Sequence, residues 1–206
     1  MTHTESHKRN LRRKEARPDE IVDSAMKLWA NQGFTATKIE DIAKGAGVAK
    51  GTVYLYFESK EAIFEAAVKI RLAGTMTQID ETSKDESLST RDLLKNFYWR
   101  VYQQLFVNGS AVLMKVLIAE GHRFPSLVNA YKSVVLSNGI HSIANILRRG
   151  VARGELNKLA NTIDNRLVMA PVVMFTTWSM ITGEQSKSAY TKLIDDHIYI
   201  LMKGLG

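Results

Sequence analysis

The stretch Thr37–Phe57, TKIEDIAKGAGVAKGTVYLYF, constrains the fold more than any other part of this sequence. Thr37 and Glu40 have the spacing of a capping box, in which each side chain accepts a hydrogen bond from the other residue's backbone N–H at a helix start. The apolar residues that follow recur with helical spacing as far as Ala46. Gly47 then suits the left-handed backbone that often ends a helix. The pattern predicts a short helix followed by a tight turn.

A second short helix is predicted to begin at Ala49 or Lys50 and to be anchored by Val53 and Phe57, which are four residues apart. Its first turn offers a basic, small and hydroxylic edge, formed by Lys50, Gly51 and Thr52. Two helices joined by a glycine turn form either an ordinary hairpin in a helical core or a helix-turn-helix, whose second helix enters the DNA major groove. The spacing alone leaves both alternatives open.

The flanking segments extend this pattern on both sides. Residues 1–17 carry six basic and two acidic side chains, and we expect a flexible arm that could follow a DNA backbone or enter a minor groove. Pro18 suits the first position of the next helix, because a helix start leaves that N–H unpaired. This helix is predicted to end at Gln32-Gly33. Ser59 is a natural N-cap for a further long helix.

Composition narrows the class of protein. The 206-residue chain contains no cysteine, which rules out disulfides and thiolate sites, and its net charge of +7 is consistent with a polyanionic partner. The most apolar stretch, Leu167–Ile181, is too short to cross a bilayer, and residues 1–17 lack the apolar segment of a signal peptide. We expect a cytoplasmic protein without a membrane partner. No spacing typical of a metal, cofactor or catalytic site is present, so no cofactor, no metal and no enzyme activity are expected.

From Pro18 to about Ala67, the chain resembles the N-terminal DNA-binding domain of the TetR family of bacterial transcriptional regulators. The resemblance runs without a gap over about fifty residues, so it is far more specific than a general helix-turn-helix pattern. Its marks are Gly33-Phe34, Thr37, Ile42-Ala43, Gly47-Val48, Gly51-Thr52, Tyr54, Tyr56-Phe57 and Ser59-Lys60-Glu61.

This resemblance implies a role for each matching position. Thr37 and Lys38 would face phosphate at the start of the first short helix. Lys50, Gly51 and Thr52 would meet base edges or backbone, Tyr54 and Tyr56 would reach phosphate or sugar, and Lys60 would bind phosphate at the start of the long helix. Helix N-termini and lysines suit phosphate, which agrees with these roles. For each tyrosine, the alternative is a core aromatic ring with an exposed hydroxyl.

The second half of the chain is predicted to be helical as well. Thr77–Thr90 is polar and indicates a loop or a frayed helix end, after which helices are expected near 91–107, 111–119, 126–149, 161–182 and 190–205. The segment from Leu117 to Pro125 resembles AcrR- or AefR-like C-terminal halves of the family, whose helices enclose an effector pocket. The residues implied to line it are Phe97, Tyr98, Val101, Met114, Ile118, His122, Tyr131, Val135 and Met174. For almost all of them, plain core packing is the alternative.

The last two helices carry more apolar surface than one small domain buries. In the family such helices pair with those of a second copy, and a two-fold dimer would place two recognition helices on successive major grooves. The expected interface residues are Val168, Met169, Val172, Phe175, Trp178, Ile194, His197, Ile198 and Leu201.

The sequence therefore predicts an all-α fold of about nine helices. It comprises a basic arm (1–17), a DNA-binding domain (18–67, with the helix-turn-helix near 37–57) and an effector-binding and dimerisation domain (68–206). The predicted function is that of a homodimeric transcriptional regulator, a repressor released from a pseudo-palindromic double-stranded DNA operator by a small, largely apolar effector. The alternative is an architectural DNA-binding protein that needs no effector.

Overall fold

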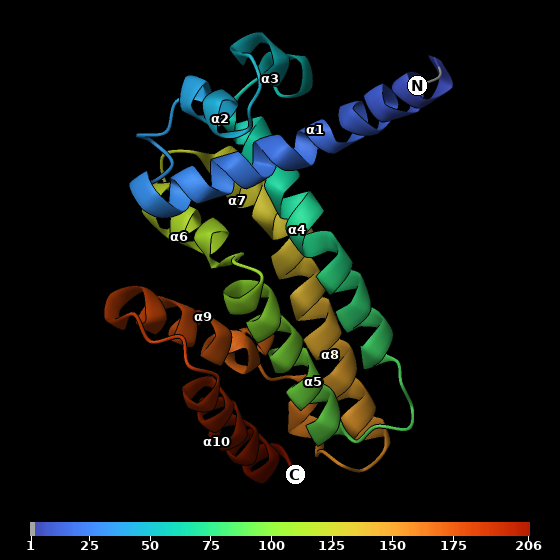
Figure 1. Cartoon of the computed structure of the whole chain (residues 1–206). Coiled ribbons are helices and arrows are strands. Elements are labelled where there is room, and N and C mark those ends of the chain that lie inside the picture. Colours follow the sequence, from blue (N-terminus) through green and yellow to red (C-terminus); the bar gives the residue numbers. More distant parts are fainter. Residues whose placement is uncertain (1–2) are drawn as a thin grey trace. The chain divides into compact units, whose positions relative to one another are not determined.

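The structure is a computed structural model that describes the backbone of residues 3–206 and the side chains from Arg17 onward. The described residues form helices and no strand, as predicted (Figure 1). Nine helices result when consecutive helical segments are counted together. The first helices are α1 His3–Gln32, α2 Ile39–Gly45, α3 Lys50–Tyr56 and α4 Lys60–Ser83. They are followed by α5 Thr90–Tyr102, which continues into the π-helical turn η1 Gln103–Val107, by α6 Ala111–Glu120, and by α7 Pro125–Tyr131, which continues through the π-helical turn η2 Lys132–Leu136 into α8 Ser137–Ala152. A 3-10 turn, η3 Lys158–Asn161, precedes the last two helices, α9 Asn165–Thr182 and α10 Lys187–Leu205.

The chain divides into two compact units. The first runs to Ile70 and also includes Val112–Ala130, whereas the second contains Arg71–Ala111 and Tyr131–Gly206. The helix α6 and the start of α7 thus pack with the N-terminal helices, although the sequence pattern assigned them to the C-terminal domain.

The first unit is built around α1. Its side chains Ile21, Val22 and Trp29 are fully buried, and so are Ile42 of α2 and Val53 of α3. In Figure 1, α2 and α3 form a pair of short helices beside α1. The turn between them has the predicted geometry, because Gly47 has a φ of 65° and the N–H of Val48 donates to the Ala43 carbonyl.

Two predictions about helix starts are wrong. Helix α1 begins at His3, so Pro18 lies inside the helix, where it removes one backbone hydrogen bond without ending the helix. The side chains of residues 1–16 lie outside those described, so the flexibility of the arm and its contact with DNA stay predictions. Thr37 does not form a capping box, since α2 is capped at Lys38 without a side-chain hydrogen bond. Helix α4 also continues to Ser83, through part of the segment predicted as a loop.

The second unit is centred on α5, which contacts α8, α9 and α10. A chain of tyrosines joins three of these helices: the Tyr98 hydroxyl donates to the Val168 carbonyl of α9, and the Tyr190 hydroxyl of α10 donates to the Tyr98 carbonyl over 2.8 Å. No single described helix is long and apolar enough to cross a membrane; Thr90–Val107 and Ala111–Glu120 meet that test only together, as a bent pair.

One buried contact sets α2 against α1 and gives a stability prediction. The Ser24 hydroxyl donates to the Ile42 carbonyl over 2.8 Å, and a Cβ added to Gly45 would lie 2.3 Å from that hydroxyl oxygen. Gly45→Ala should therefore displace the hydroxyl and lower the free energy of unfolding by about 1 kcal/mol, as should Ser24→Ala. Chemical denaturation measures both changes.

The double variant provides the control for this contact. After Ser24→Ala, the nearest side-chain atom to the new Cβ is the residue 24 Cβ at 3.4 Å, an ordinary contact. The double variant should therefore be no less stable than Ser24→Ala alone. Additive losses would contradict the contact as described.

Candidate nucleic-acid interface

The outer edge of α2 and α3 collects most of the side chains predicted to bind DNA. Lys38, Lys50, Gly51 and Tyr54 are exposed, and Thr52 and Tyr56 are half-buried. Val53 and Phe57 point the other way and are buried, which leaves the opposite side of α3 open. The described structure thus presents a short, partly basic helix face with small and hydroxylic residues at its N-terminal turn.

Lys50 does not stand alone on this face. Its ammonium pairs with the carboxylate of Glu40 on α2 and lies 5.9 Å from the centre of the Tyr54 ring. The hydrogen bond to Glu40 raises the pKa of Lys50 and lowers that of Glu40. Because both side chains of this ion pair are exposed, their interaction is weak, and the Lys50 ammonium stays accessible to an anion.

Thr37 has a different role from the predicted one. It is only 1% exposed, and its hydroxyl donates to the Gly33 carbonyl over 2.7 Å. The side chain therefore closes the loop between α1 and α2, and in this conformation it cannot face phosphate. The predicted capping box does not form because the Thr37 hydroxyl is bound to the Gly33 carbonyl, just after the end of α1.

Lys60 also serves the loop between α1 and α2. Its ammonium donates to the carbonyls of Phe34 and Thr35 over 2.8 and 3.2 Å and lies 4.8 Å from the centre of the Phe34 ring. Burial lowers the pKa of Lys60. These contacts leave at most one of its three N–H groups for a phosphate. The residue is thus a clamp on the loop that precedes α2.

A third set of contacts comes from the corner Glu120–Phe124, between α6 and α7. The Phe124 ring packs edge-on against Phe34 with centroids 5.4 Å apart. Thr35 donates a hydrogen bond from its hydroxyl to Glu120, which lowers the pKa of that carboxylate. Lys115 on α6 donates to the Ala30 carbonyl at the end of α1 over 3.0 Å. No pattern in the sequence predicts these long-range contacts.

The nine residues predicted to line an effector pocket are divided between the two units. Met114, Ile118 and His122 lie in the first, and the other six lie in the second. Phe97, Tyr98 and Tyr131 are buried, and burial raises the pKa of Tyr131 to about 12. Met174 and Ile118 are about half exposed, at 48% and 57%. A common cavity for these residues stays a prediction.

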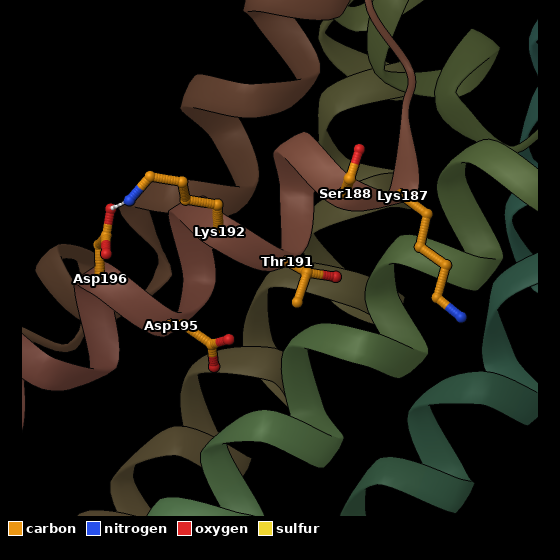
Figure 2. Close-up of a pocket in the computed structure, with 6 residues that line it drawn as sticks. All are labelled: Lys187, Ser188, Thr191, Lys192, Asp195 and Asp196. Carbon is orange, nitrogen blue, oxygen red and sulfur yellow. Dashed lines mark hydrogen bonds and ion pairs between the residues drawn. The ribbon is translucent and has the colours of Figure 1, made fainter.

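Two hollows in the second unit lie elsewhere, along α10. The larger, of about 830 Å³, is an open surface hollow lined by polar side chains (Figure 2), and the smaller, of about 220 Å³, lies between α5 and α10. Asp195 lines both and pairs with Lys95 of α5 over 2.7 Å. Neither hollow is lined by a residue predicted for the effector pocket. Among the described residues, no group of acidic side chains and histidines could hold a metal.

The structure corrects most of the predicted dimer interface. Six of its nine residues lie in the core of the second unit, namely Val168, Val172, Phe175, Ile194, Ile198 and Leu201. Met169 and His197 are half-buried, and His197 lies 6.0 Å from Tyr98, ring centre to ring centre. Only Trp178 is exposed, at 51%. Both helices carry apolar residues on several faces, so periodicity could not show which face the chain itself covers.

An apolar surface nevertheless exists on α9, displaced around the helix from the predicted one. We call it the exposed α9 face, formed by Leu167, Met174, Trp178 and Ile181. Their spacing of seven, four and three residues places them on one side of the helix. On α10, Tyr199 and Ile200 are exposed as well, at 57% and 66%.

The role of Lys60 can be tested without DNA. Lys60→Met should lower the free energy of unfolding by about 1 kcal/mol, because two loop carbonyls lose their donor. Hydrogen exchange should accelerate at the amides of residues 33–37. Lys69→Met removes an exposed lysine of the same helix that pairs with Glu65, and it should leave this loop unchanged. Equal exchange in both variants would refute the clamp.

Comparison with known proteins places both halves of the chain in one family of regulators. Residues 21–67 match the model of bacterial regulatory proteins of the tetR family, and residues 92–199 match that of the AefR-like transcriptional repressor C-terminal domain. Over 82 residues, 39% of this chain, it is 34% identical to the fatty acid metabolism regulator protein of Bacillus subtilis. Over 51 residues, 25% of this chain, it is 39% identical to the biofilm operon icaADBC HTH-type negative transcriptional regulator IcaR of Staphylococcus aureus.

These alignments span 42% and 27% of the two relatives, less than half of each. Solved structures cover more of the chain. The transcriptional regulator FadR from Bacillus subtilis in complex with stearoyl-CoA has a TM-score of 0.75 and 21% identity, covering 91% of this chain and 98% of that one. A TetR-family regulator from Mesorhizobium loti has a TM-score of 0.76 and 22% identity, covering 94% and 98%. The fold is the same, and the two family matches together show that the chain belongs to the TetR family of bacterial regulatory proteins.

Proposed function

We propose that the protein is a homodimeric repressor that binds a pseudo-palindromic DNA operator and responds to a small, largely apolar ligand. The observation that carries the proposal is the exposed edge of α3, where Lys50, Gly51 and Thr52 stand on a helix anchored by buried Val53. A small residue permits close approach to DNA, and a lysine and a hydroxyl supply donors for phosphate or base edges. Lys38 and Tyr54 extend the same surface.

Two copies of α3 are needed for an operator of this kind, because successive major grooves lie about 34–36 Å apart along the duplex. The exposed α9 face supports a dimer, since four large apolar side chains in one stripe are costly to leave in water. We place the two-fold interface on this face and on Tyr199 and Ile200 of α10, in place of the buried residues expected from the sequence.

The ligand is proposed to bind in the second unit. One structural neighbour, FadR from Bacillus subtilis, is recorded in complex with stearoyl-CoA, and a curated relative from the same organism is a fatty acid metabolism regulator. A long-chain acyl-CoA is therefore the first ligand class to test. Its apolar chain would suit a helical domain whose core is rich in large aliphatic and aromatic side chains.

Helix α4 is the proposed route from ligand to DNA. Its first turn carries Lys60, which holds the loop before α2, and its later turns belong to the second unit. There the Thr75 hydroxyl donates to the side-chain oxygen of buried Gln104 over 2.8 Å, and the Gln104 amide donates to Ser110 over 2.7 Å. A ligand that shifts η1 or α5 would displace α4 through these hydrogen bonds. The displacement would change the separation of the α3 helices in the two copies of the dimer.

DNA binding is tested by selecting duplexes from a random-sequence library with the purified full-length protein. Affinity for a selected duplex should fall with salt, with log K changing by about −0.9 per phosphate contact against log salt concentration. Lys38→Ala should lessen that slope by about 0.9, while Lys69→Ala should not. Stearoyl-CoA, but not free CoA, should release the duplex in fluorescence anisotropy. Failure to enrich any sequence would refute the proposed function, and enrichment without ligand response would favour an architectural binder.

The interface is tested by Trp178→Glu. A carboxylate on the exposed α9 face should shift the protein from dimer to monomer in analytical ultracentrifugation, because a charge would be buried without a partner. Operator affinity should fall by at least tenfold as a consequence. Val107→Glu alters a side chain that is 70% exposed outside that face, and it should remain dimeric. A dimeric Trp178→Glu protein would place the interface elsewhere.

A further inference from the structure

Leu55 is exposed on the surface proposed to meet DNA. Its side chain is 82% exposed, more than that of any other large apolar residue from Arg17 onward. The family resemblance implies a DNA contact for Lys50, Gly51, Thr52, Tyr54 and Tyr56 of α3 but none for this leucine. A leucine has no hydrogen-bond donor or acceptor, so it cannot serve as a phosphate ligand.

The helix geometry places Leu55 at the crest of α3. With 3.6 residues per turn, residues two before and two after Val53 lie opposite that buried side chain, and these are Gly51 and Leu55. A Cβ added to Gly51 would have no neighbour within 4 Å. Helical leucines lean toward the N-terminus, so the isobutyl group extends along bare backbone at Gly51. An apolar group thus stands at the most outward line of the helix.

Only one apolar group projects into the DNA major groove, the C5-methyl group of thymine. Polar residues flank Leu55 on the accessible edge, with Lys50 and Tyr54 on one side and Thr52 on the other. Those polar side chains suit phosphates and polar base atoms. Leu55, which lies between them, is the residue suited to an apolar contact.

We propose that Leu55 determines operator specificity by packing against the C5-methyl group of a thymine in each half-site. The inference rests on the proposed function, because it requires α3 to lie in a major groove. It adds the identity of one base per half-site and the residue that selects it. Leu55 is then a specificity-determining residue, whereas Lys38 contributes affinity without selecting sequence.

The test compares thymidine with deoxyuridine, which differs only by the absence of the C5-methyl group. A duplex selected from a random-sequence library is made again with single dT-to-dU replacements in symmetric half-site positions, and dissociation constants are measured by fluorescence anisotropy at one salt concentration. For the unaltered protein, one symmetric pair of replacements should weaken binding by about fourfold for each methyl lost. The remaining pairs should have little effect.

Three variants locate the methyl contact. Leu55→Ala should bind the dT duplex more weakly and bind the dT and dU duplexes equally, with an unchanged salt dependence. Leu55→Met keeps an apolar side chain of similar volume and should retain the preference for dT. Lys38→Ala should weaken both duplexes by the same factor. Circular dichroism checks that each variant is folded.

The outcomes separate this inference from the proposed function. Absence of any enriched sequence would refute both. An enriched operator with no invariant thymine, or one bound equally with dT and dU, would overturn only the role of Leu55. Persistence of the dT preference in Leu55→Ala would also overturn it, because another residue would then contact the methyl group.

Discussion

A buried aromatic cluster holds the first unit together, and the position of the edge proposed to bind DNA depends on it. Trp29 of α1, Phe34 of the following loop and Phe64 of α4 lie with ring centres 5.5 to 6.4 Å apart. The Lys60 ammonium lies over the Phe34 ring and donates to the adjacent carbonyls, and the Phe124 ring packs against Phe34 as well. Aromatic packing and a desolvated cation together fix the loop from which α2 and α3 begin. A displacement of α4 or of the corner Glu120–Phe124 would therefore reach α3 through this loop.

In the second unit, buried tyrosines hold the helices together through hydrogen bonds. The hydroxyls of Tyr98 and Tyr190 form buried hydrogen bonds with carbonyls of α9 and α5, and burial raises the pKa of both phenols. Because these bonds fix the inward face of α9, the outward face is fixed as well. The exposed α9 face is thus a consequence of how α9 packs against α5 and α10.

Much of the fold was predictable because it depends on local chemistry. The turn at Gly47, the bounds of α3 and the Ser59 cap of α4 follow from residue types and spacing over a few positions. Predictions failed where an alternative partner lay outside the local window. Pro18 was predicted to start α1, yet the preceding Leu-Arg-Arg-Lys-Glu-Ala-Arg run consists of good helix formers, and the helix continues through the proline. Thr37 was predicted to cap α2, yet the Gly33 carbonyl is its acceptor.

The sequence by itself determined that the chain is helical, where most helices lie, and that a glycine turn separates α2 from α3. It also determined which residues can stand on the outer face of α3, since periodicity relates Gly51 and Leu55 to Val53 within one helix. Only the tertiary structure decided what Lys60 binds, that Val112–Ala130 packs with the N-terminal helices, and that Trp178 faces outward while Val172 and Phe175 face inward. The physical reason is that periodicity orders side chains around a helix axis, whereas long-range packing chooses which side meets another helix and which meets water.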